Sequence, residues 1–78
     1  MKNEIFYQNL NSNKSLIQRL ASKMSNDFAT SRFLFFETAH QAIKNKEKIK
    51  EENFHDWLIV TMKNINKGLL KNPIQVSN

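Results

Sequence analysis

The segment that most constrains the fold is Ser31-Arg32-Phe33-Leu34-Phe35-Phe36, which places three phenylalanines and a leucine within six residues. At about 100° per residue, a helix through this segment carries a broad apolar arc. Its members are Phe33, Phe36, Ala29, His40 and Ile43, with Phe28, Phe35, Ala39 and Ala42 beside them. An arc of roughly half the circumference is wider than the stripe of an ordinary surface helix. The helix therefore needs two neighbours, which predicts an all-α fold.

The size of the chain limits how much of this apolar surface it can bury. A chain of 78 residues forms one domain, and folding buries only about 60% of the surface that the unfolded chain exposes. There is no cysteine, so neither disulfides nor thiolate metal sites support the core. Small domains without such supports are often completed by a partner. We therefore expect a homodimer or a protein partner.

Helical spacing and capping residues predict a small bundle of three main helices with a short N-terminal fourth. The short helix is expected over residues 3–10, followed by a loop at residues 11–13, and the first main helix over residues 16–24. Ser25, Asn26 and Asp27 are good capping residues, so we expect a break there. The aromatic helix then runs from about residue 28 to residue 44 or beyond. One continuous helix from Leu16 onward is the alternative.

The last long helix is predicted to begin at Asn53. Gly68 is expected to cap it in the left-handed conformation, so that Leu69 and Leu70 fold back over the bundle. Pro73 excludes further helix. We accordingly predict a helical domain over residues 1–70 and a flexible tail over residues 71–78. The predicted core consists of Leu20, Met24, Phe33, Phe36, Leu58, Met62 and Ile65.

Three residues depart from the helical pattern and are the candidates for a partner-binding surface. Arg32 lies near the middle of the apolar arc, whereas Leu34 and Val60 lie on the polar sides of their helices and are expected to be exposed. Each alone has an ordinary explanation, since single exposed apolar residues are common and arginine can extend its charge out of a core. Taken together, they predict a partner-binding surface, because aromatic residues and arginine are the usual anchors of interfaces.

The net charge of +5 permits a second hypothesis, a nucleic-acid interface. The charge is spread along the chain, at +3 over residues 1–36, 0 over residues 37–52 and +2 over residues 53–78. A basic helical face can still form from Arg19, Lys23, Lys63, Lys67 and Lys71. A helix-turn-helix reader over residues 16–36 is disfavoured, because its second helix is the most apolar in the chain and Ser25 replaces the usual turn glycine.

The sequence offers little for catalysis or metal binding. Glu37 and His40 have the spacing found in di-iron bundles, but such sites need two of these motifs and further glutamates. We expect His40 to be partly buried and hydrogen-bonded, and His55 beside Asp56 to be a surface histidine. No serine lies in a nucleophile elbow and no glycine-rich loop is present. We therefore expect no enzymatic activity, no cofactor and no metal.

The apolar run Trp57-Leu58-Ile59-Val60 is too short to span a membrane, and the N-terminus does not resemble a signal peptide. A cytoplasmic protein without a membrane partner is expected. A short Lys- and Asn-rich helical chain resembles plasmid and phage accessory proteins, although no motif supports that resemblance. The predicted function is a non-enzymatic adaptor, inhibitor or regulator that binds a protein, with a nucleic-acid-binding accessory protein as the alternative.

Overall fold

The computed structural model describes residues 1–71, and these residues are helical without any strand. The elements in chain order are α1 (Asn3–Ser12), α2 (Lys14–Met24), α3 (Phe28–Lys44), the 3-10 turn η1 (Glu51–Asn53) and α4 (Phe54–Lys71). The predicted all-α bundle is therefore confirmed, and so is its short N-terminal helix. Asn13 alone separates α1 from α2, in place of the predicted loop.

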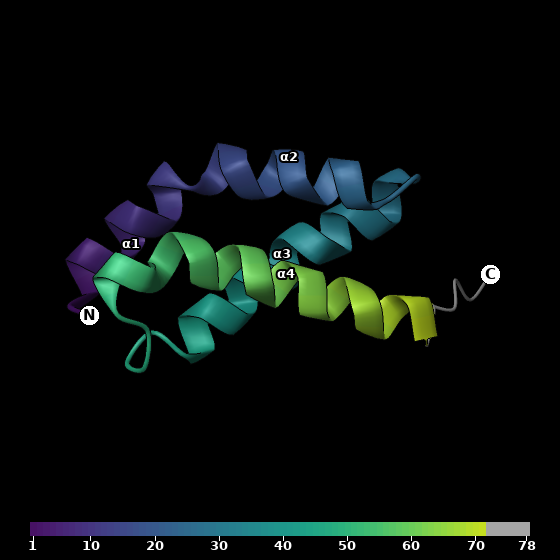
Figure 1. The fold of residues 1–78 in the computed structure, drawn as a ribbon. Coiled ribbons are helices and arrows are strands. Elements are labelled where there is room, and N and C mark those ends of the chain that lie inside the picture. Colours follow the sequence, from purple (N-terminus) through teal and green to yellow (C-terminus); the bar gives the residue numbers. More distant parts are fainter. Residues whose placement is uncertain (72–78) are drawn as a thin grey trace.

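One side of α3 packs against both α2 and α4. Figure 1 shows α2 and α4 running lengthwise, with α3 crossing behind α4 and α1 lying at the end where α4 begins. The broad apolar helix thus has the two neighbours that its sequence demands.

Asp27 fixes the point at which α3 begins. Its backbone is extended, and its carboxylate accepts hydrogen bonds from the Thr30 backbone N–H at 2.7 Å and from the Thr30 hydroxyl at 2.8 Å. These bonds stabilise the charged form and lower the pKa of Asp27 below its ordinary value. The predicted break at residues 25–27 is confirmed, and the continuous helix is wrong.

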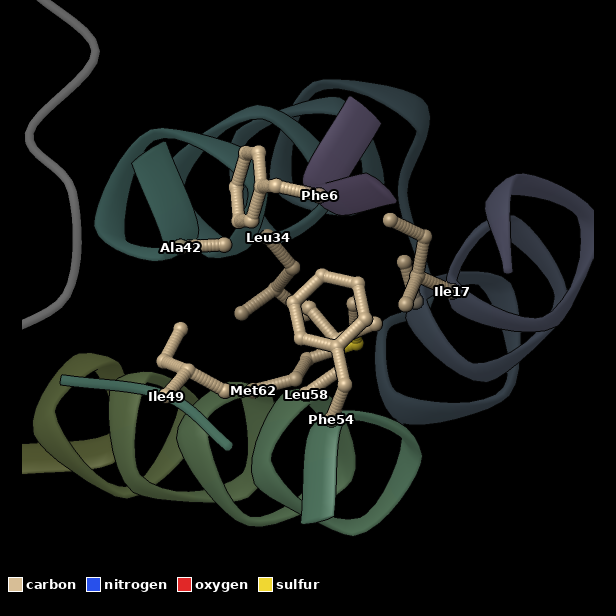
Figure 2. Close-up of a cluster of buried hydrophobic side chains, with 9 residues drawn as sticks. Phe6, Ile17, Leu34, Ala42, Ile49, Phe54, Leu58 and Met62 are labelled. Atoms are coloured by element: carbon tan, nitrogen blue, oxygen red, sulfur yellow. The ribbon is translucent and has the colours of Figure 1, made fainter. Parts of the chain in front are cut away.

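The core lies between α2, α3 and α4 and is closed at one end by α1 (Figure 2). Leu58 and Met62 are fully buried as predicted, whereas Leu20, Met24 and Ile65 are partly buried against the same cluster. The aromatic volume of the core comes from Phe6 of α1 and Phe54 of α4, whose ring centroids are 5.4 Å apart. Phe33 and Phe36 are not in the core, so that part of the prediction is wrong.

The buried side of α3 is the reverse of the predicted one. Leu34, Thr38 and Ala42 are fully buried, so the expectation that Leu34 is exposed is wrong. These residues recur every four positions, and Thr38 and Ala42 are small. The distance between packed helices depends on the side chains at the contact. The small side chains on this side of α3 therefore allow both α2 and α4 to pack close to it. The bulkier phenylalanines lie on the opposite side.

The end of α4 also differs from the prediction. Gly68 does not adopt a left-handed conformation, and the helix continues through it to Lys71. Leu70 is 76% exposed, so it does not fold back over the bundle. Asn53 lies in η1, and α4 begins one residue later at Phe54. Lys71 is helical rather than part of a tail, and the rest of the predicted tail lies outside the described residues.

Candidate functional site

The side of α3 that faces away from the core carries four large exposed apolar side chains. Phe28 is 76% exposed, Phe33 38%, Phe36 56% and Ile43 40%. Arg32 and His40 are exposed on the same side of the helix. We call these six residues the aromatic face of α3. Contiguous exposed apolar surface is unusual on small monomeric proteins, so the aromatic face is the candidate interaction site.

The guanidinium of Arg32 contacts two of these rings. Its guanidinium carbon lies 5.7 Å from the centroid of the Phe28 ring and 5.5 Å from that of Phe36, which are cation–π distances. Phe36 in turn meets Phe35 edge to face, with a centroid separation of 5.2 Å. Two rings of the aromatic face, Phe28 and Phe36, therefore have contacts with Arg32 within the free protein.

Shallow hollows extend along α3. One, of about 270 Å³, lies where α1, α2 and α3 meet and is lined by residues that include Tyr7, Lys14 and Phe35. A second, of about 600 Å³, lies between α2 and α3, and its lining includes Phe35, Arg32 and Phe36. Phe35 lines both, so the two hollows adjoin at this side chain, and together we call them the α2–α3 groove. Phe36 joins it to a third hollow beside His40 on the aromatic face.

The residues that line the α2–α3 groove include two cations, Lys14 and Arg32, and no acid. The carboxylate of Asp27 accepts its bonds from Thr30, and that of Glu37 accepts one from the Gln41 amide at 3.0 Å. Within residues 1–71, the structure forms no ion pair at Lys14, Arg32 or Lys44. Glu37 lines the hollow beside His40 and Asp27 lies beside Phe28, so the excess of cations is confined to the α2–α3 groove, where Lys14 and Arg32 have no carboxylate partner in the described part of the chain.

The structure does not bring the predicted partner-binding residues together. Arg32 lies on the aromatic face, whereas Leu34 is buried in the core and cannot contact a partner. Val60 is 55% exposed as predicted, but it lies on the side of α4 that faces away from the core. Of the original candidates, only Arg32 belongs to the aromatic face.

The candidates for nucleic-acid binding are all exposed, but they lie on different helices. Arg19 and Lys23 are on the solvent side of α2. Lys63, Lys67 and Lys71 recur every four residues on α4 and therefore form one exposed stripe.

The titratable residues do not form a metal or catalytic centre within residues 1–71. No group of three or more potential His, Cys, Asp or Glu ligands occurs in this range. His40 is exposed on the aromatic face, so its predicted partial burial is wrong. His55 Nδ1 lies 3.3 Å from Asp56 Oδ1, and both side chains are exposed, so His55 is a surface histidine as predicted. Among the described helices, none is long and apolar enough to cross a membrane.

Comparison of the chain with protein-family models, with curated proteins and with solved structures found no match. The functional argument therefore depends on the surface itself. Phe28, Phe33 and Phe36 were not among the predicted site residues, because the pattern favoured them as core. One signal for them was present in the sequence: Leu34 places a large apolar residue on the side of the same helix that lies opposite the arc.

Proposed function

We propose that this protein is a non-enzymatic adaptor, inhibitor or regulator that binds another protein through the aromatic face of α3. The observation that supports the proposal is the exposure of four large apolar side chains on one side of a single helix. Aromatic residues and arginine are the side chains that most often dominate the binding energy of protein interfaces. The aromatic face carries both.

The order of the surface also suits binding. Association costs free energy for each side chain that becomes immobilised. The Phe28 and Phe36 rings already flank the Arg32 guanidinium, and all six residues of the face belong to one helix. A partner therefore meets a surface whose side chains lose little further freedom.

Affinity capture with matched variants tests this function. Phe28→Ser and Phe36→Ser each remove an exposed ring from the aromatic face, and Leu70→Ser is the control, because Leu70 is as exposed as Phe28 but lies on α4. We expect the wild type and the Leu70→Ser variant to retain the same proteins, and both phenylalanine variants to lose them while keeping wild-type circular dichroism. Retention of the same proteins by all four chains would contradict the proposal.

Nucleic-acid binding is the second candidate function, and the exposed stripe of Lys63, Lys67 and Lys71 favours it. Each phosphate contact that is removed lowers the slope of log affinity against log salt by about 0.9 for duplex DNA. Lys63→Gln and Lys67→Gln would then weaken binding of a labelled duplex and flatten its salt dependence. Under our preferred proposal, neither lysine variant alters protein capture.

A further inference from the structure

The chemistry of the partner follows from the charges that border the aromatic face. Lys14 lines the α2–α3 groove, Arg32 lies between two exposed rings, and Lys44 ends α3. The acids next to this surface, Asp27 and Glu37, accept hydrogen bonds from Thr30 and Gln41. A partner that covers the apolar side chains thus approaches cations without carboxylate partners in the described chain, and a partner with acidic residues complements them.

The dimensions of the surface suit a helix. From Phe28 to Ile43 the aromatic face extends about 22 Å along α3, at about 1.5 Å per residue. A partner helix of about four turns covers this length. The hollows between α2 and α3 and beside His40 are open channels along the helix rather than enclosed cavities for a small molecule. Amphipathic helices bind such channels by inserting apolar residues that recur every three or four positions.

We propose that the aromatic face and the α2–α3 groove bind an acidic amphipathic helix of another protein. The apolar stripe of that helix covers Phe33, Phe36 and Ile43, and its flanking carboxylates pair with Lys14 and Arg32. This inference rests on the proposed function, and it adds the charge and the secondary structure of the partner.

A second copy of the chain fits the same surface less well. Each copy carries a net charge of +5, so two copies repel each other. An antiparallel pairing of two α3 helices about Phe36 also places Arg32 of one copy opposite His40 of the other. Stacked bases are a poorer fit too, because the Arg32 guanidinium already lies over the Phe28 and Phe36 rings.

Three fluorescein-labelled peptides of about 18 residues, roughly 27 Å of helix, provide the test. The first has leucines at helical spacing flanked by glutamates, the second replaces every glutamate with lysine, and the third scrambles the order of the first. Fluorescence anisotropy with the full chain measures the affinities. We expect the acidic amphipathic peptide to bind at least about 10-fold more tightly than the other two, because both the charge and the apolar spacing contribute.

Variants of the protein locate the binding. Phe36→Ser should weaken the acidic peptide by at least about 10-fold. Lys14→Gln should weaken it by about 3-fold or more, whereas Lys67→Gln, which changes the net charge equally but lies on α4, should have no more than a slight effect.

Equal affinity for the lysine peptide, or equal effects of Lys14→Gln and Lys67→Gln, would overturn the proposal. So would self-association through the aromatic face, or displacement of the acidic peptide by single-stranded DNA. If Phe36→Ser abolishes protein capture but the acidic peptide does not bind, the inference about the partner is wrong and the proposed protein-binding function stands.

Discussion

Individual side chains in this small bundle determine where α3 begins and which way it faces. Asp27 ends the connection after α2 by accepting two hydrogen bonds from Thr30. Leu34 is buried in the core on one side of α3, while the Arg32 guanidinium contacts the Phe28 and Phe36 rings on the other side. The helix start and the helix orientation are therefore set by different residues and can be tested separately.

The cap at Asp27 makes a pH-dependent contribution to stability. The pKa of Asp27 is lowered in the folded protein by the bonds from Thr30, so the stabilisation is present above its unfolded value of about 3.9 and is lost as the pH falls through the lower folded value. We expect Asp27→Ala to lower the melting temperature at pH 7, and the difference from wild type to shrink at pH 3. Thermal circular dichroism measures both.

Asp27→Asn, which keeps a hydrogen-bond acceptor without the charge, is the control. The melting temperature of this variant should itself depend less on pH than that of the wild type. A difference between Asp27→Ala and wild type that is the same at both pH values would contradict this account.

The orientation of α3 predicts opposite costs for neighbouring residues. Leu34→Ala should lower the free energy of unfolding by about 2–5 kcal/mol, because it leaves a cavity in the core. Phe36→Ala should change it by only about 0.5 kcal/mol, as is usual for exposed positions. Urea denaturation of the two variants measures these values. A larger loss for Phe36→Ala than for Leu34→Ala would show that the aromatic side faces the core.

At the scale of the elements, the sequence predicts the number and positions of the helices better than their orientation. Capping residues and helical spacing locate α3 correctly from Phe28 to Lys44. They do not show which of its two apolar sides is buried. A hydrophobic pattern predicts that the phenylalanines are buried, whereas close packing of three helices favours small side chains at the contact. Phe6 and Phe54 fill the core in place of Phe33 and Phe36. They come from distant helices, so no local pattern shows that they take this place. For the same reason, the predicted partner-binding residues include Leu34 with Arg32 and Val60, and omit the phenylalanines beside Leu34.

The continuity of α4 gives a prediction at the same scale. Gly68 is helical, and a Cβ added there would meet nothing within 4 Å. Gly68→Ala should therefore raise the free energy of unfolding by about 0.5–1 kcal/mol, because alanine loses less backbone entropy in a helix. Urea denaturation measures the change. A destabilised variant would indicate that Gly68 ends the helix in the left-handed conformation.

The whole molecule is a small bundle whose most apolar helix is buried on one side only. α2 and α4 cover the ridge of Leu34, Thr38 and Ala42, and the aromatic face stays exposed. In a chain of 78 residues, no described helix remains to cover it. This incomplete burial connects the fold to the proposed function, because the proposed partner protein covers the aromatic face of α3.

Cysteine labelling tests this central claim most directly, because the chain has no cysteine of its own. Phe36→Cys and Val60→Cys form a matched pair, since the two native side chains are 56% and 55% exposed on α3 and α4. Both variants should react with a maleimide at similar rates in the free protein, while Leu34→Cys should stay protected. In the complex with a captured protein, Phe36→Cys should become protected and Val60→Cys should not. Slow labelling of Phe36→Cys in the free protein, or protection of Val60→Cys alone in the complex, would contradict the account.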